Sequence, residues 1–513
     1  MTKAAVRFDA VSTLIHGSTI VINSIIERKE SVLPGEEPEL VELPPVRLPS
    51  PDELAPAAEA TPAIERLRRF VAWVGEGSGK GRKLTQKGRL TLADGKALVE
   101  LLGTGDRTDP VIGDTAFKTR SSAELPGVAI TFAWARAAGL VRVVHGRVVP
   151  VKRNQALLDR PLDLWSRALE GLRQLGPDIL GDAMLGSFLA EDLDSLVPAV
   201  LLAMYGGDEP VQLRTLADIA WNDVRGTYDL AGQPSPVTST WRWMVASELD
   251  RVLQHLELLG AVERVPAGSR PEPDLDLDLD VQLPIAPRYP LGGDAMLETG
   301  FRLTVLGTWG ANRVFRDLGI DAPVIGDLAA ADAATLLERC AEYSETDCQA
   351  EFEGWCQARG GEAAAAELVA LLSVTDDLGT RMLGFQALGA AGTAGVDAAR
   401  SLMDNPDLRP YATMWLVDRG HEKQEAVAPD MAARMLVETC ALVAATDGPV
   451  AAAQLLTDLG PPEEQAAIVG SFWRVESPHV GPALDALASS HPHKLVAKAA
   501  RKAAFKLRST GRS

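Results

Sequence analysis

Basic side chains are concentrated in two stretches of the sequence, where they could bind the phosphates of an anionic partner. Lys and Arg contacts to phosphate give an affinity that is independent of base sequence and that falls as salt rises. The first stretch surrounds and follows a run of glycines at 75–81, and the second lies on both sides of a predicted turn at 145–146. The candidate binding residues are Lys80, Arg82, Lys83, Lys87, Arg89, Arg136, Arg142, Arg147, Lys152 and Arg153.

A run of alternating aspartates offers a different chemistry. Four aspartates alternate with leucine from 274 to 280, and aspartates at alternate positions also begin the calcium loop of an EF-hand. That loop needs Gly and Glu where this sequence has Leu279 and Ile285. The alternation instead favours a strand with all four carboxylates on one side, facing solvent or a partner and opposing aggregation.

The remaining chemistry-bearing residues form no catalytic or metal-binding motif. The glycines at 75–81 resemble a phosphate loop, but Val74 replaces its first glycine and Gly81 its hydroxyl residue. The seven histidines contain no His-x-x-x-His pair, and His145 and His255 are predicted at the surface. No Gly-x-Ser-x-Gly motif is present. The sequence therefore nominates no catalytic residue, cofactor or metal, and an enzyme is the least favoured interpretation.

The four cysteines are predicted to be buried, reduced thiols. Cys340, Cys348 and Cys356 are spaced by eight residues on what reads as one helix, and Cys440 is isolated. A zinc site would need closer ligand pairs. The uncharged run at 10–26 is too polar for a signal peptide or a membrane span, so a cytoplasmic protein is expected.

Charge is divided unevenly along the chain. The 513 residues include 51 Lys and Arg against 70 Asp and Glu, a formal net charge of −19. Residues 64–160 reverse that balance, with 18 Lys and Arg against 9 Asp and Glu. Because an acidic protein as a whole repels nucleic acid, such a partner is expected to meet this basic segment.

The elements that hold the basic stretches follow a pattern that occurs twice. In the first copy an apolar helix ends at Gly139, and two strands joined at His145-Gly146 follow. In the second copy the helix ends at Gly260, and the returning strand at 301–306 comes after a long acidic insert. A helix, a glycine cap and two antiparallel strands are typical of the end of a winged helix, a fold that binds nucleic acid or proteins.

The helix that would face DNA bases carries few side chains suited to reading them. The segment from Pro126 to Arg136 offers only Thr131 and Arg136, whereas specific readout needs several such groups on one exposed face. Binding is therefore expected to be mostly non-specific. Two alternatives stay open: the basic face is merely solvated, or it docks onto the acidic remainder of the chain.

The expected fold class is mainly α with small β wings: two winged-helix-like modules followed by a HEAT-like helical repeat or an ordinary helical bundle. The prolines at 31–62 block helix and central strand alike, so this stretch is predicted to be a stiff extended linker or a surface strap. Leu378–Gly389 and Val396–Met403 are predicted to pair as a helical hairpin. The predicted parts are an N-terminal segment and linker (1–63), a basic module (64–160), a helical connector (161–210), a second module with an acidic wing insert (211–330) and the helical domain (331–513).

The last predicted helix, at 480–507, carries a basic stripe. Lys494, Lys498, Arg501 and Lys502 stand at helical spacing, and no acidic residue follows Asp485. A second anion-binding strip is one interpretation. A solvated face is favoured, because cations also suit the C-terminal end of a helix.

Three short motifs carry a resemblance to a group of proteins. LTQKGRL at 84–90, GLVR at 139–142 and LTVLG at 303–307, read as a strand, resemble motifs of uncharacterised proteins from GC-rich bacterial genomes, over about residues 64–320. The resemblance implies winged-helix-like modules and carries no catalytic residue across.

Three functional hypotheses follow. The favoured one is a non-enzymatic protein that binds nucleic acid through residues 64–160 and a protein partner through its helical domain. The second is a purely protein–protein scaffold in which the winged-helix-like modules are structural. The third is an enzyme.

Overall fold

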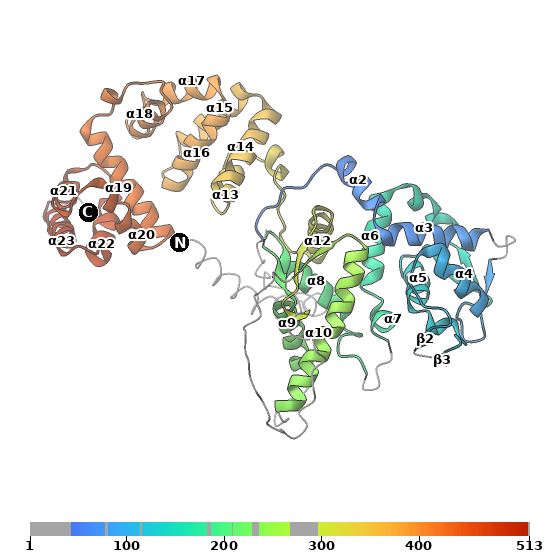
Figure 1. Ribbon diagram of the computed structural model, residues 1–513. Helices are drawn as coiled ribbons and strands as arrows, with labels where there is room; N and C mark the ends of the chain where they lie inside the picture. The colour runs from blue at the N-terminus through green and yellow to red at the C-terminus, as the bar shows by residue number, and fades with distance from the viewer. Residues whose placement is uncertain are drawn as a thin grey trace, which may run out of the picture. The chain divides into compact units, whose positions relative to one another are not determined.

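The computed structural model describes residues 43–76, 81–112, 115–181, 186–207, 209–227, 235–266 and 296–510. They belong to two compact units that meet in sequence between Pro323 and Val324, close to the predicted boundary at 330. Both units are shown in Figure 1. As expected, the described residues are mainly helical, with small antiparallel sheets.

The first unit holds all the described strands. Its helices are α2 (Pro51–Glu59), α3 (Pro62–Gly75), α4 (Leu92–Leu102), α5 (Pro126–Ala137), α6 (Pro161–Leu172), α7 (Gly176–Leu180), α8 (Leu193–Met204), α9 (Leu213–Thr227), α10 (Ser235–Leu258) and α12 (Val305–Leu318). Its strands are β1 (Arg82–Lys83), β2 (Val111–Ile112), β3 (Thr115–Ala116), β4 (Val141–Val144), β5 (Arg147–Pro150), β6 (Val211–Gln212), β7 (Val262–Val265) and β8 (Gly300–Leu303).

One order of elements occurs twice in this unit. In the first copy, α3, β1, α4, α5, β4 and β5 follow one another, and the sheet order is β1-β5-β4. In the second copy the same order is filled by α8, β6, α9, α10, β7 and β8, with the sheet order β6-β8-β7. The second copy therefore begins at α8, inside the segment 161–210 that the sequence predicted as a connector.

Local sequence signals explain the boundaries of the first copy. The Thr91 side chain accepts a hydrogen bond from the Asp94 N–H and begins α4, and Gly103 ends α4 in the left-handed conformation. The predicted turn between β4 and β5 is confirmed: both His145 and Gly146 have positive φ, at 47° and 71°. Two successive positive φ values match the right-handed twist of a hairpin.

The second copy differs from its prediction at the returning strand. Residues 301–306 were expected to form one strand, but β8 ends at Leu303 and Thr304 caps α12. The Thr304 Oγ1 accepts a hydrogen bond from the Gly307 N–H at 2.9 Å. A Cβ at Gly307 would lie 1.7 Å from the Ala261 carbonyl oxygen, so α12 approaches the backbone as only glycine allows.

The proline-rich stretch is not extended throughout its described part. Residues 51–59, predicted as linker, form α2, with Leu54 and Ala58 buried. Pro51 occupies the first turn of the helix, where its missing N–H costs no intrahelical hydrogen bond. The Glu53 carboxylate accepts hydrogen bonds from the Ser50 N–H and hydroxyl, which stabilises the start of α2.

Helix α6 joins the two copies of the repeated arrangement. The Trp165 side chain is fully buried, and its indole N–H donates to the Leu259 carbonyl oxygen at 2.7 Å. Its ring lies 5.8 Å from that of Trp309, and a Cβ at Gly310 would come within 2.4 Å of it. On the other side, the Trp134 indole of α5 donates to the Ala168 carbonyl oxygen at 2.7 Å. Both copies thus share one core.

Acidification is expected to weaken the first unit through His255, which was predicted at the surface but lies half-buried. Its Nδ1 is 2.7 Å from the Arg251 carbonyl oxygen, and its ring is 6.3 Å from that of Trp134. Burial, with a smaller contribution from the charge of Arg66, lowers the pKa of His255.

Because the unfolded chain binds this proton more readily, the contribution of His255 to stability is full above about pH 6.5 and falls as the pH drops towards the lower folded pKa. Urea unfolding at about pH 7.5 and about pH 5.5 should show a larger loss of stability for the native protein than for the variant His255→Gln. An equal loss in both would contradict this role of His255.

The second unit is entirely helical within its described residues. Its helices are α13 (Ala333–Cys340), α14 (Glu345–Arg359), α15 (Gly361–Leu372), α16 (Leu378–Ala390), α17 (Thr393–Leu402), α18 (Arg409–Asp418), α19 (Pro429–Thr446), α20 (Pro449–Gln454), α21 (Pro462–Val469), α22 (Val480–Ser490) and α23 (Lys494–Ser509). Figure 1 shows α13 to α18 following one another, with α19 to α23 gathered near the C-terminus.

Two apolar cores hold this unit. One lies among α13 to α18 and includes Trp355 and Phe385, and the other lies among α19 to α23 and includes Phe472. The predicted helices at 378–389 and 396–403 correspond to α16 and α17, which pack against each other. The predicted single helix at 480–507 is two, because the chain turns at Pro492, where proline lacks the N–H that a continuing helix needs.

The predicted burial of the four cysteines is confirmed, and none forms a disulfide. The prediction that Cys340, Cys348 and Cys356 lie on one helix is wrong, because Cys340 lies in α13 and the other two lie in α14. The Cys348 thiol donates to the Cys340 carbonyl oxygen at 2.9 Å. Burial raises the pKa of Cys356 and of Cys440 to about 11, so these thiols stay protonated at neutral pH.

Candidate functional site

Two segments that contain no carboxylate meet in the β1-β5-β4 sheet. Residues 81–90 and 139–158 together contain eight Lys and Arg and no Asp or Glu. Strand β1 pairs with β5, and β4 pairs with β5, so the basic stretches that lie far apart in sequence form one surface. The sheet, the turn at 85–89 and the 3₁₀ helix Lys152–Asp159 that follows β5 are called the basic face below, and Asp159 at the end of that helix is its one carboxylate.

The register of the sheet decides which of its side chains reach solvent. Directly opposed residues share a face of a sheet, and successive residues alternate between faces. Val148, opposite Arg82, is fully buried and marks the inner face. Lys83 is opposite Arg147, and Arg142 is opposite Val149. Arg147 and Val149 are two residues apart in β5, so the side chains of these four residues lie on the same, outer face. The outer face of three short strands therefore carries three cations.

Two of the predicted site residues have structural partners. The Arg82 guanidinium lies 4.2 Å from the Trp73 ring centroid and donates to the Trp73 carbonyl oxygen at 2.8 and 3.1 Å. The Arg147 Nη1 donates to the Gly81 carbonyl oxygen at 3.0 Å. These contacts fix β1 against α3 and β5 and leave the two guanidinium groups only partly free to meet a ligand.

The other predicted cations of the basic face are exposed. None of them has a carboxylate within ion-pair distance among the residues that the structure describes. Arg136, at the end of α5, is also exposed and lies 5.7 Å from the Phe132 ring centroid. Lys80 lies outside the described residues. The exposed cations of the basic face are Lys83, Lys87, Arg89, Arg142, Lys152 and Arg153.

Helix α5 has little free surface for reading bases. Thr131, one of its two predicted base-reading residues, is 5% exposed, and its hydroxyl donates to the Gly127 carbonyl oxygen of the same helix. Phe132 and Trp134 are buried as well. Because α5 packs against α3, α4 and α6, Arg136 is the remaining polar side chain at its surface that could contact a base edge.

A hairpin that the sequence analysis did not single out is tied to the basic face and carries further cations. Strands β2 and β3 pair between α4 and α5, and the loop around them carries exposed Arg107, Lys118 and Arg120. The Ser122 hydroxyl donates to the Leu90 carbonyl oxygen at 2.7 Å, which ties this loop to the end of the 85–89 turn. Residues 103–125, between the two predicted helices, hold three cations and four carboxylates, so their charge balance provided no signal for this loop.

The base of this hairpin is fixed by one aspartate. The Asp109 N–H donates to the Thr119 hydroxyl and the Thr119 N–H to the Asp109 carboxylate, both at 2.8 Å. The Lys96 ammonium group also bonds that carboxylate, at 2.6 Å. These contacts hold the pKa of Asp109 below its ordinary value, with the Lys96 bond the larger cause. Asp109 therefore stays ionised near neutral pH.

The corresponding sheet of the second copy has the opposite character. Arg302 of β8 pairs with Glu263 of β7, its direct cross-strand neighbour. Arg264 bonds Asp250 at 2.9 Å, and Arg214 bonds Glu298 at 3.0 Å. The cations beside this sheet are thus neutralised by carboxylates. The aspartates at 274–280 in its wing lie outside the described residues.

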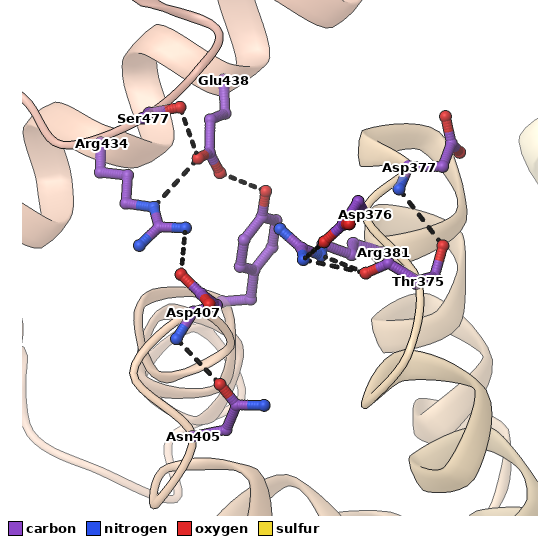
Figure 2. Close-up of polar contacts among 10 residues, drawn as sticks. Thr375, Asp376, Asp377, Arg381, Asn405, Asp407, Arg434, Glu438 and Ser477 are labelled. Atoms are coloured by element: carbon purple, nitrogen blue, oxygen red, sulfur yellow. Dashed lines mark hydrogen bonds and ion pairs between the residues drawn. The ribbon is translucent and has the colours of Figure 1, made fainter. Parts of the chain in front are cut away.

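The second unit contains a buried polar network, shown in Figure 2. Glu438 of α19 is fully buried and accepts hydrogen bonds from the Tyr411 hydroxyl, from the Arg434 Nε at 3.0 Å and from the Ser477 hydroxyl at 2.8 Å. Arg434 also bonds Asp407 at 3.1 Å. Burial, and then the bond to Glu438, raise the pKa of Tyr411. These contacts join α18, α19 and the segment before α22.

The described residues contain no group of three or more His, Cys, Asp and Glu side chains that could hold a metal ion. Among the same residues, no helix has both the length and the apolar character that a membrane span requires. Comparisons with protein family models, with curated proteins and with solved structures found no match to this chain. The geometry of the basic face is therefore the feature from which a function can be inferred.

Proposed function

We propose that the first copy of the repeated arrangement, residues 64–160, is a winged-helix-like module that binds the phosphate backbone of duplex nucleic acid without base specificity. The observation that carries the proposal is the basic face, where eight cations from 81–90 and 139–158 come together and the one carboxylate, Asp159, stands at the end of the 3₁₀ helix. Unpaired cations on a rigid surface bind phosphate through the release of condensed counterions.

The second copy serves as an internal contrast for this proposal. It has the same strand order, yet Arg302, Arg264 and Arg214 are ion-paired. A surface that has neutralised its own charge gains little from phosphate contacts. Unpaired charge therefore distinguishes the first copy. We assign the phosphate contacts to the first copy and a structural role to the second copy.

The same proposal gives the second unit the role of a HEAT-like platform for a protein partner, with no catalytic residue in either unit. It is supported by helices α13 to α18, which pack on their neighbours in sequence. Arrays of this kind present extended surfaces to partners. In this proposal the protein connects nucleic acid to another protein, and the purely protein–protein scaffold is the alternative.

The proposal predicts that neutralising the outer face of the sheet weakens DNA binding. The double variant Lys83→Gln/Arg142→Gln of the full-length protein should bind a labelled duplex about tenfold more weakly, and equally so for unrelated sequences. Both side chains are exposed, so folding should be unaffected. Fluorescence anisotropy at low salt measures the effect.

The matched control is Arg302→Gln/Arg214→Gln, which removes the same number of charges from the corresponding sheet of the second copy and from the start of α9 beside it. This variant should bind duplex as the native protein does, because those cations are already paired. Equal weakening by both variants would show that only net charge matters. No binding of duplex by the native protein would leave the scaffold alternative.

A further inference from the structure

Helix α23, at the C-terminal end of the second unit, has one face in the core and one face free. Its inner face buries Val496, Ala500, Ala503, Ala504 and Leu507 against the rest of the unit. Its outer face is exposed and carries cations and one aromatic ring. The exposed cations of that outer face and its ring, called the α23 strip below, are Lys494, Lys498, Arg501, Lys502, Phe505 and Arg508, and Leu495 beside them is 41% exposed.

The charge of the α23 strip is nearly uncompensated. No Asp or Glu follows Asp485 in the sequence. The Arg508 guanidinium approaches Asp485 at 3.9 Å, and the Arg501 side chain donates to the Ala488 carbonyl oxygen at 3.3 Å. Lys494, Lys498 and Lys502 have no carboxylate within ion-pair distance among the described residues. An anionic partner would therefore meet free charge.

The exposure of Phe505 is not explained if the outer face of α23 is simply a polar surface in contact with solvent. Its side chain is 69% exposed, whereas most large apolar side chains of this unit are buried. Residues three and four apart are neighbours on a helix, so Arg501, Lys502 and Arg508 surround Phe505. An exposed aromatic ring within a cluster of cations is the arrangement on which a base stacks while its flanking phosphates are neutralised.

This geometry favours nucleic acid over a lipid surface. A helix that lies in a membrane interface buries a wide apolar face in the lipid. The apolar face of α23 is already occupied by the core of the second unit, so only Phe505 and the partly exposed Leu495 are left to insert. Duplex is less suited than a single strand, because the bases of a duplex stack on one another rather than on a protein ring.

We propose that the α23 strip is a binding site for single-stranded nucleic acid, with Phe505 stacking on a base and the surrounding cations contacting its phosphates. This site is independent of the basic face of the first unit, because it rests on different residues and on a different form of nucleic acid. Its contacts are sequence-tolerant, because every base has a face on which to stack.

The test uses the full-length protein in the background Lys83→Gln/Arg142→Gln, which lowers the contribution of the first unit. Phe505→Ala should weaken binding of a labelled oligothymidylate about tenfold and leave duplex binding unchanged. Phe505→Trp should keep or improve the affinity, because it keeps the ring. Lys423→Gln, an exposed cation elsewhere in the same unit, should have no effect.

Equal affinity for the oligothymidylate in the parent, Phe505→Ala and Phe505→Trp proteins would overturn the proposal. So would the absence of oligothymidylate binding at low salt, or binding to phosphatidylserine vesicles that depends on Phe505. Duplex binding by the protein with its native first unit reports separately on the basic face. The two proposals can therefore fail independently.

Discussion

Replacement of Glu438 by alanine is expected to lower the free energy of unfolding of the second unit by about 3 kcal/mol. The carboxylate is fully buried and accepts hydrogen bonds from Tyr411, Arg434 and Ser477. The substitution leaves two hydroxyl donors and one guanidinium edge without their acceptor, and it opens a void. Arg434 keeps its bond to Asp407, which limits the loss.

Two further variants separate the charge of Glu438 from its volume. Glu438→Gln fills the same space but places an N–H₂ group near a donor, so it should cost less than the alanine variant and still destabilise. Tyr411→Phe removes one donor and should cost about 1 kcal/mol. Urea unfolding followed by circular dichroism measures all three.

Glu422→Ala is the control for the Glu438 series, because Glu422 is an exposed carboxylate in the same unit. It should stay within about 0.5 kcal/mol of the native protein. A Glu438→Ala protein as stable as this control would show that the network in Figure 2 does not stabilise the second unit.

Replacement of Trp165 by alanine is expected to destabilise the first unit by about 3–5 kcal/mol, the usual cost of deleting a large buried side chain. The indole lies between the two copies of the repeated arrangement, against Trp309 and Gly310. Its N–H is also the donor to the buried Leu259 carbonyl oxygen, which would lose its partner. The variant should therefore weaken the cohesion of both copies at once.

A smaller substitution tests the same contact. Trp165→Phe keeps most of the ring but removes the donor, so it should cost less than the alanine variant. Leu101→Ala, which truncates a side chain that is 41% exposed, should have a small effect. If Trp165→Ala unfolded at the same urea concentration as Leu101→Ala, the shared core around α6 would not hold the unit together.

The sequence predicted best those features that depend on neighbouring residues. Gly139, the His145-Gly146 turn and the Thr91 cap each follow from the conformational preferences of a few residues, and the structure confirms them. The error at Pro51 had a local cause as well. The general rule that proline blocks a helix does not hold for the first turn, which accounts for Pro51 but not for Pro56 inside α2.

Features that depend on distant contacts were beyond the sequence. Arg82 and Arg147 looked like free cations, but partners on α3 and near β1 occupy both. Thr131 looked available for base contacts until the packing of α5 buried it. The Glu438 network joins residues separated by up to 39 positions, and no local pattern marks them. Sequence indicates charge, whereas tertiary packing decides which charges remain free.

The salt dependence of duplex binding by the full-length protein tests the central proposal most directly. If the six exposed cations of the basic face contact phosphates, the slope of log K against log salt should be on the order of −3 to −5, independent of base sequence. In the variant Lys83→Gln/Arg142→Gln the slope should become shallower by about 2. A native slope near zero, or an unchanged slope in the variant, would contradict the assignment of phosphate binding to this face.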